Sequence, residues 1–526
     1  MHITVYLMRK DVDIKDIISS QNIINSKYKE YEQAVDSELQ FPCCAWIQNN
    51  KKSKPKWLKF LSPAFSFSNT LMINQSNSFI LGISVCNRVF AVTFGYAFSA
   101  LNRENIETDF GLRVTLNAVN PDELDTVDAR TIDLKTKQTK THLNMGSNFS
   151  EFGLQTNIDW LKSVRGFTNI DQFMGKIQGS DSIRINWKDN ISSLNKLCEK
   201  LLELYQSTNY KESFGFIDHL CKISKDDPLI KDLKKEVLLM ISREERESIA
   251  VAYPEIPQPK TSKYRIIGEA KDRARSEVEE IDMDAFYDYI LSYRNANDDQ
   301  LPKFEKTYVY ELDDDGNYSS DRKSLWSYIV AQINYDSRTY ILSLGEFFKI
   351  DNDYVNELRE KIAKIEDISD FLDLPEWTKG LKEGTYNLYL SQNRKWLLLD
   401  RKMFSFKNNF NKIECADILT DSQDFIHVKS MTSSATMSHL FAQGLVSADL
   451  LRRVTEYKTE LAEKFKDEYG FEYNDGRGRV VYAIGTDKEG PIADSLFFFS
   501  MVHLAQAVDR LKSMNWPVAI CKIKRK

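Results

Sequence analysis

The sequence predicts a multidomain α+β protein with a mixed-sheet N-terminal part, a helical middle and a C-terminal α/β part on a central mixed sheet. Three observations predict this. The chain has 526 residues, whereas a domain usually holds roughly 100–200. β-branched and aromatic runs dominate the first part, leucines three and four apart dominate the next, and strand and helix patterns alternate in the last third. We therefore expect domains over 1–190, 191–260 and 261–526.

The N-terminal part is predicted to be rich in strands. Residues 79–85 and 88–94 are β-rich runs on either side of Cys86-Asn87, a pattern typical of a hairpin. The periodicity over 106–119 is mixed, and we expect a helix there. The other expected elements are strands at 3–7, 43–47 and 57–61 and a helix at 14–26.

The middle of the chain is predicted to be helical over 191–248. Pro254, Pro257 and Pro259 then interrupt regular structure, because proline fixes φ and lacks a backbone donor. We place a domain boundary near 252–262. Helices at 277–295 and 354–365 and strands at 307–312 and 338–344 are expected after it.

The last third has the clearest pattern. Three strands in close succession, a helix, a further strand and another helix–strand pair favour a mixed sheet covered by helices. The expected strands are 395–400, 412–419, 424–430, 479–485 and 518–523, and the expected helices are 434–465 and 504–514.

Composition restricts the function classes. The 71 basic and 77 acidic side chains give a net charge of −6, which argues against nonspecific coating of nucleic acid or of a membrane. Seven cysteines without a CxxC pair favour a reducing compartment. No apolar stretch reaches the roughly 18 residues of a membrane span, and the N-terminus does not resemble a signal peptide. We expect a cytoplasmic protein without a membrane partner.

A candidate catalytic constellation lies in the C-terminal part. Asp417 lies near the end of one predicted strand, and His427 and Lys429 lie two apart on the next. Strand alternation places His427 and Lys429 on one face and their apolar neighbours on the other. A carboxylate, a second ligand and a cation are what metal-assisted phosphodiester hydrolysis requires. The alternative is that these residues serve only the fold, with Asp417 and Lys429 forming an ordinary cross-strand ion pair.

This arrangement resembles the restriction-endonuclease-like (PD-(D/E)XK) nuclease superfamily, whose motif is an Asp ending a hairpin strand and an acidic-x-Lys on the next, followed by a helix. The resemblance implies that Asp417 holds Mg²⁺, for which Mn²⁺ can substitute, that His427 is a metal ligand or a proton shuttle, and that Lys429 stabilises charge. Glu414 is a further candidate metal ligand that would compensate for His427, although a straight strand turns it away from Asp417. It also implies that Gln443, on the following helix, orients water. His427 stands where the superfamily has an acidic residue, and imidazole is a weaker Mg²⁺ ligand than carboxylate. No organic cofactor is expected.

The whole chain also resembles a sporadically distributed family of bacterial proteins without a settled activity, associated with mobile islands and suspected of antiphage defence. The matching stretches are short and dispersed. They are Phe94–Tyr96, Asp109–Arg113, Leu116–Asn117, Gly179–Asp181, Ile426–Lys429, Ser438–Gly444 and Phe498–Ser500.

Local basic segments are candidate nucleic-acid contacts. Lys51, Lys52, Lys54 and Lys56 offer phosphate contacts beside Trp57. A solvated loop is the alternative for these lysines. Arg477 and Arg479, in a turn before a strand, offer further phosphate contacts at the rim of the C-terminal sheet.

Together these patterns predict an antiphage-defence or mobile-island protein that binds nucleic acid, with DNA favoured over RNA, and that cleaves phosphodiesters through a divergent metal-dependent site. The alternative is a non-enzymatic nucleic-acid or protein-binding module with a decayed nuclease-like fold. The expected partners are nucleic acid, a second copy of the chain, and a phage or partner protein as trigger.

Overall fold

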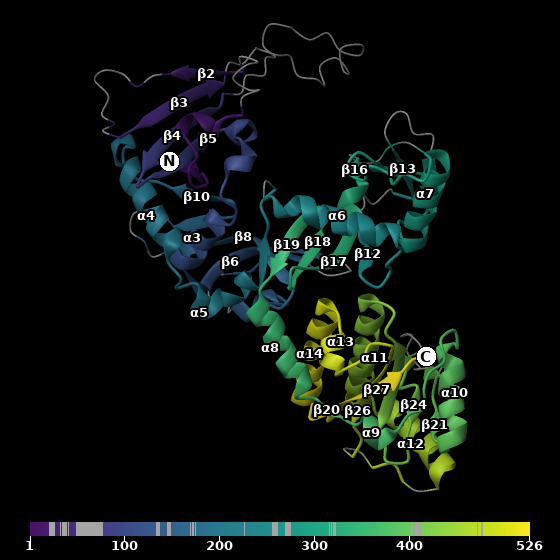
Figure 1. The fold of residues 1–526 in the computed structure, drawn as a ribbon. Helices are drawn as coiled ribbons and strands as arrows, with labels where there is room; N and C mark the ends of the chain where they lie inside the picture. Colours follow the sequence, from purple (N-terminus) through teal and green to yellow (C-terminus); the bar gives the residue numbers. More distant parts are fainter. Residues whose placement is uncertain are drawn as a thin grey trace, which may run out of the picture. The chain divides into compact units, whose positions relative to one another are not determined.

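The computed structural model forms two compact units. Unit 1 comprises Met1–Thr131, Lys137–Asp218 and Ser224–Asp227, and unit 2 comprises Ile132–Thr136, His219–Ile223 and Pro228–Lys526 (Figure 1). The structure describes residues 1–19, 27–31, 33, 39, 41–48, 77–132, 137–144, 149–168, 170, 173, 175–225, 227–254, 261–268, 275–314, 316, 318, 322–400, 403–404, 413–470, 472–474 and 477–526.

Unit 1 is built on a ten-stranded sheet in which every paired neighbour is antiparallel. In spatial order the strands are β2 (Tyr28–Tyr31), β3 (Cys43–Gln48), β4 (Phe79–Val85), β5 (Arg88–Phe94), β1 (His2–Leu7), β10 (Ser182–Asn186), β9 (Lys176–Gly179), β8 (Asp159–Thr168), β6 (Val119–Thr131) and β7 (Lys137–His142). The predicted hairpin is β4–β5. Cys86 and Asn87 have φ values of 52° and 57°, as a two-residue turn matching strand twist requires.

Helices α3 (Phe110–Ala118) and α4 (Leu194–Gln206) cover one face of this sheet (Figure 1). Two glycines permit close packing of α3. A Cβ on Gly111 would lie 1.9 Å from the Ser182 carbonyl oxygen, and a Cβ on Gly179 would lie 1.8 Å from the Gly111 carbonyl oxygen. Leucines of α4 at the spacing that predicted a helix are buried in the unit 1 core, so this helix belongs to the N-terminal sheet.

Unit 2 begins with two smaller antiparallel sheets. The five-stranded sheet contains β11 (Leu220–Lys222), β19 (Glu346–Ile350), β18 (Arg338–Ser343), β17 (Ile329–Tyr335) and β12 (Ile249–Val251). The four-stranded sheet contains β14 (Arg275–Val278), β13 (Lys263–Ile267), β15 (Tyr308–Leu312) and β16 (Lys323–Ser324). Helices α6 (Leu229–Ser242) and α7 (Met283–Ala296) contribute to the core that these sheets share.

The C-terminal part of unit 2 contains a six-stranded mixed sheet. Its strands in spatial order are β20 (Glu366–Asp367), β27 (Val518–Lys524), β26 (Val480–Thr486), β25 (Phe425–Ser430), β24 (Ile418–Leu419) and β21 (Leu397–Leu398). The pairs from β20 to β25 are parallel, and the last two pairs are antiparallel. Its helices are α8 (Asn352–Ala363), α9 (Ser369–Leu372), α10 (Glu383–Arg394), α11 (Ser434–Arg453), α12 (Thr455–Tyr469), α13 (Ile492–Ser495) and α14 (Phe498–Ser513).

The predicted α+β class is confirmed: several mostly antiparallel sheets combine with helices. The predicted strand over 412–419 is wrong in its extent. Residues Ile413–Glu414 form β23, which pairs with β22 (Met403–Phe404) in a separate small sheet, and the chain bends at Asp417 before β24. Among the described residues, no helix combines the length and the apolarity that crossing a membrane requires.

Candidate functional site in the C-terminal sheet

The ladder between β24 and β25 ends at Asp417. Ile418 is the last β24 residue paired with β25, opposite Ile426. The Asp417 amide still donates to the Ile426 carbonyl at 3.0 Å, and the Val428 amide donates to Asp417 Oδ2 at 2.7 Å. The Asp417 carboxylate thus accepts the hydrogen bond that a carbonyl of the neighbouring strand would otherwise accept. A hydrogen bond to a charged group typically adds roughly 1.5–3 kcal/mol to the free energy of unfolding.

Asn387 on helix α10 contacts both Asp417 and a second carboxylate, that of Asp400. Asn387 is fully buried, and its Nδ2 lies 3.2 Å from Asp400 Oδ2 and 3.2 Å from Asp417 Oδ1. One amide group therefore links Asp400, two residues after β21, to Asp417, the residue before β24. Asp400 and Asp417 are held as neighbours at the side of the sheet that α10 covers.

Lys429 joins the same arrangement through Glu383. Its Nζ donates to Glu383 Oε1 at 2.7 Å, and the two side chains are 23% and 31% exposed. Glu383 and Asn387 are four residues apart and share one face of α10. We call Glu383, Asn387, Asp400, Asp417 and Lys429 the C-terminal polar cluster.

His427 lies apart from these contacts. Its side chain is 2% exposed, and its ring centroid lies 6.2 Å from that of Tyr482. Within the described part of the chain Nε2 has no hydrogen-bond partner. Burial lowers the pKa of His427 to about 4, so the imidazole is neutral at physiological pH. Strand alternation predicted that His427 and Lys429 point the same way, but the long Lys429 side chain near the strand end reaches α10 instead.

Two further predicted site residues lie on other elements. Gln443 is half-buried on α11, and among the described residues no hydrogen bond connects it with the cluster. Glu414 belongs to β23, whose partner strand is β22, and lies outside the six-stranded sheet. From the predicted set, Asp417 and Lys429 therefore both contact α10, Asp417 through Asn387 and Lys429 through Glu383.

The arginines predicted to contact phosphate, Arg477 and Arg479, differ from one another in their surroundings. Arg479 is bidentate to Asp424, at 2.9 and 3.2 Å, and also bonds Glu366 at 3.0 Å. Two carboxylates thus neutralise this guanidinium. Arg477 is exposed. Lys51, Lys52, Lys54 and Lys56 lie outside the described residues.

Sequence reasoning missed Glu383, Asn387 and Asp400. Asp400 ends the strand predicted over 395–400, just as Asp417 precedes a strand, and two carboxylates at ends of neighbouring strands are a recognisable signal. Glu383 and Asn387 carry only the i, i+4 spacing of one helix face, and no helix was expected there.

The cluster has donors suited to Mg²⁺. This ion binds through one or two carboxylates and keeps several waters, and each carboxylate oxygen can accept more than one bond. Asp400 and Asp417 therefore fit in donor chemistry and in proximity. No group of three or more His, Cys, Asp or Glu side chains in the described part of the chain is placed to hold a metal.

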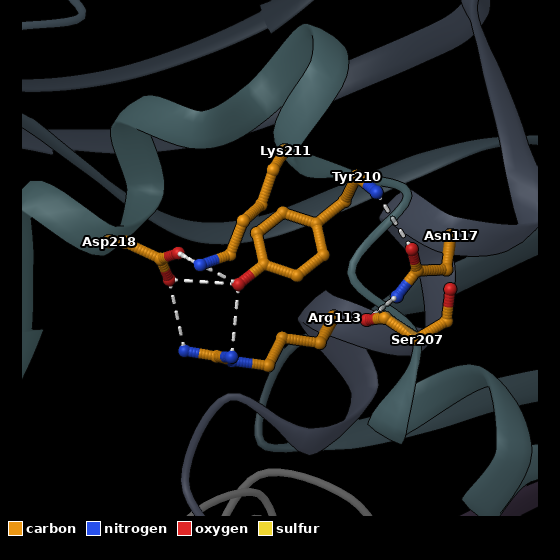
Figure 2. Close-up of polar contacts among 6 residues, drawn as sticks. All are labelled: Arg113, Asn117, Ser207, Tyr210, Lys211 and Asp218. Carbon is orange, nitrogen blue, oxygen red and sulfur yellow. Dashed lines mark hydrogen bonds and ion pairs between the residues drawn. The ribbon is translucent and has the colours of Figure 1, made fainter.

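The motif residues of α3 form a second polar network, in unit 1 (Figure 2). Asp218 accepts from Arg113 at 3.1 Å and from the Tyr210 hydroxyl at 2.9 Å, and it pairs with Lys211 at 3.1 Å. Arg113 also donates to the Tyr210 hydroxyl at 3.0 Å. The carboxylate is surrounded by donors, so the network fixes the chain after α4 rather than presenting a reactive group.

Asn117 extends this network one turn along α3 (Figure 2). Its Nδ2 donates to the carbonyls of Leu204 at 2.8 Å and Ser207 at 3.0 Å, and its Oδ1 accepts from the Tyr210 amide at 2.8 Å. Both amide hydrogens and the carbonyl are thus used at the end of α4. These short motifs have a structural role.

Comparison with known families gives one match. A family described as "Family of unknown function (DUF6119)" matches residues 3–524. The chain belongs to this family. No curated protein matches the chain significantly. Because the DUF6119 match spans both units, the N-terminal sheet and the C-terminal sheet are parts of one family architecture.

Proposed function

We propose that the protein is a metal-dependent endonuclease, that its C-terminal part has the restriction-endonuclease-like architecture, and that the C-terminal polar cluster is the active site. The element order α10, β21, β24, β25, α11, β26 supports the proposal, since it places an Asp before one strand and a Lys on the next. The observation that carries it is the Asn387 bridge between Asp400 and Asp417, beside the Glu383–Lys429 ion pair.

Each residue of the cluster has a separate task in this proposal. Asp400 and Asp417 would hold Mg²⁺ or Mn²⁺. A bound divalent ion polarises the phosphoryl group and lowers the pKa of a coordinated water. Asn387 positions the two carboxylates. Lys429 stabilises charge that develops on the phosphate, and Glu383 holds the Lys429 ammonium in place before substrate binds.

We assign a packing role to His427, because its neutral ring lies against Tyr482. In this proposal the carboxylates of Asp400 and Asp417 replace the acidic residue that the superfamily has at the position of His427. Gln443 has no task that its described contacts support, and Glu414 lies on β23, outside the six-stranded sheet.

The wider proposal is a cytoplasmic antiphage-defence or mobile-island protein that acts on nucleic acid, with DNA favoured over RNA. All seven cysteines are free thiols, as a reducing compartment would keep them. A phage component or partner protein as trigger, and assembly with a second copy, belong to this proposal.

The test is cleavage of plasmid, linear duplex, single-stranded DNA and RNA by the full-length protein with Mg²⁺ or Mn²⁺. Lys429→Ala is expected to lower the rate by about 10²–10³-fold, the usual effect of removing one charge-stabilising donor. Lys464→Ala is the matched control, because Lys464 also pairs with a carboxylate, that of Glu460 at 2.6 Å. Equal losses in both variants, or none, would contradict the assignment.

A binding module without catalysis is the second candidate. It is favoured by the pairing of Lys429 with Glu383. Retained nucleic-acid binding by a folded wild-type protein, with no cutting under any metal condition, is the result that this candidate predicts.

A further inference from the structure

The face of the ten-stranded sheet opposite α3 carries a continuous polar row. Val127, Val164, Ile177 and Ile183 point into the core beneath α3. Successive side chains on a strand point to opposite faces, so the residues beside these four lie on the other face. Four of them are opposite one another in register across β6, β8, β9 and β10: Thr126, Arg165, Gln178 and Arg184. His142 on β7 is opposite Thr126 and extends the line by one strand. We call this the sheet row, and at ~4.8 Å per strand it spans roughly 19 Å.

Cations outnumber anions on this face. Asp125 is 2% exposed and binds both Arg165, at 2.8 Å, and Lys176. Burial raises the pKa of Asp125, but the bonds from Arg165, Lys176 and Thr126 outweigh burial and bring the pKa below its usual value. One ionised carboxylate therefore faces two cations, and one positive charge remains.

Two more cations add to this surplus. Lys140 and Arg184 are exposed, and neither has an ion-pair partner in the described part of the chain. Asp128 on β6 is opposite Lys140 in register and offsets one of these two charges. The face is thus locally positive on a chain whose net charge is −6.

A cavity of about 250 Å³ opens on the row. Every residue lining it has a hydrogen-bonding side chain: Thr126, Lys140, His142, Ser163, Arg165 and Gln178. An apolar ligand would leave these groups unpaired. Arginine, lysine, hydroxyl and amide donors together are the groups that contact phosphate oxygens in nucleic-acid complexes.

An aromatic side chain lies beside the cations. Phe167 is half-buried two residues after Arg165 on β8, and Lys176 Nζ lies 4.6 Å from its ring centroid. A second ring, Trp160, lies at the other end of β8. Unpaired bases stack on aromatic rings of this kind, whereas a duplex keeps its bases stacked on one another.

We propose that the sheet row binds single-stranded nucleic acid, with phosphates on Arg165, Lys140 and Arg184 and a base against Phe167. The site is in unit 1 and is separate from the C-terminal polar cluster. It therefore stands whether or not that cluster is catalytic.

The test is fluorescence anisotropy of a 5′-labelled 20-nucleotide single strand with the full-length protein in EDTA, titrated at several salt concentrations. The variant is Lys140→Ala/Arg184→Ala, which removes two exposed side chains without a described ion pair. We expect about tenfold weaker binding and a salt slope smaller by about 1.4, since each single-strand phosphate contact contributes about 0.7.

The matched control is Lys188→Ala/Lys196→Ala, which removes two exposed lysines of unit 1 outside the row. Phe167→Leu is expected to weaken binding of the normal strand and to leave binding of an abasic strand unchanged. Equal affinity of the row variant and wild type, equal loss in the control pair, or tighter binding of a duplex of the same length would overturn the proposal. Because EDTA removes divalent ions, binding is measured independently of cleavage.

Discussion

Replacing Asn117 by alanine removes three hydrogen bonds that fix the end of α4. The side chain donates to Leu204 and Ser207 and accepts from Tyr210, at 2.8, 3.0 and 2.8 Å. A typical net contribution is about 1 kcal/mol per hydrogen bond. Since the site is half-buried, water compensates only in part, and the free energy of unfolding of unit 1 is expected to fall by about 2–3 kcal/mol.

The assay is urea denaturation of the full-length protein, followed by hydrogen exchange and mass spectrometry of peptides covering 110–118 and 194–218. Asn117→Asp keeps the acceptor for the Tyr210 amide but turns a charged oxygen toward two carbonyls, so its loss is expected to be at least as large. Asn190→Ala is the control, because Asn190 makes no side-chain capping bond, and its effect is expected within about 0.5 kcal/mol. Equal midpoints for Asn117→Ala and Asn190→Ala would refute the role of Asn117.

Two further predictions concern unit 1. The pKa of Asp125 is lowered in the folded state. Its ion pairs with Arg165 and Lys176 therefore stabilise the folded protein fully at a pH above 3.8, the pKa of the unfolded chain. This stabilisation is lost as the pH falls through the lower pKa of the folded state. The measurement is urea unfolding of wild type and Asp125→Asn between about pH 2.5 and 6. We expect the difference in their free energies of unfolding to be constant above about pH 5 and to shrink below pH 3.8. Gly111→Ala places a Cβ 1.9 Å from the Ser182 carbonyl oxygen, and we expect a loss of about 3 kcal/mol or more in thermal unfolding of unit 1.

Each of these predictions has a control in the same unit. Asp122→Asn changes an exposed carboxylate, so its stability difference from wild type is expected to stay near zero at every pH. Gly215→Ala adds a Cβ with nothing within 4 Å and is expected to unfold like wild type. A pH-independent Asp125→Asn difference, or a Gly111→Ala variant as stable as Gly215→Ala, would contradict the respective argument.

Local sequence signals predicted the elements whose patterns are strongest. β4–β5, β25, β26 and β27 were expected nearly at their observed bounds, because continuous β-branched runs between turn residues have few alternatives. The helix predicted over 434–465 is divided into α11 and α12 at Val454, where the backbone is extended. A bend of this kind has no signal in hydrophobic periodicity.

The candidate site could be predicted only in part. Asp417 and Lys429 were found from spacing on two neighbouring strands, but their partners Asn387 and Glu383 come from a helix that precedes both strands. Which helix face lies against the strands depends on the packing of Tyr386 and Leu390 in the core, and no local pattern contains that information. Alternation also failed to predict the partner of Lys429, because this long side chain near the end of β25 reaches Glu383 on α10, whereas His427 lies beside Tyr482.

The position of the sheet row, in contrast, follows from register. Thr126, Arg165 and Arg184 are far apart in the sequence, and antiparallel pairing places them in one line. Among the described residues, the sheet row thus lies in unit 1 and the C-terminal polar cluster in unit 2.

Whether the C-terminal polar cluster is an active site is tested by the initial rate of Mg²⁺-dependent cleavage by wild type and Asp417→Asn, with folding checked by circular dichroism. Asparagine keeps an acceptor for the Val428 amide but removes the charge that would hold the ion. Asp487→Asn is the control, since Asp487 forms an exposed ion pair with Lys379. We expect at least about a 100-fold loss for Asp417→Asn, of the order found when one charge-stabilising group is removed, and none for Asp487→Asn. Equal rates for Asp417→Asn and wild type, or no metal-dependent cutting of any substrate by wild type, would contradict the active-site assignment.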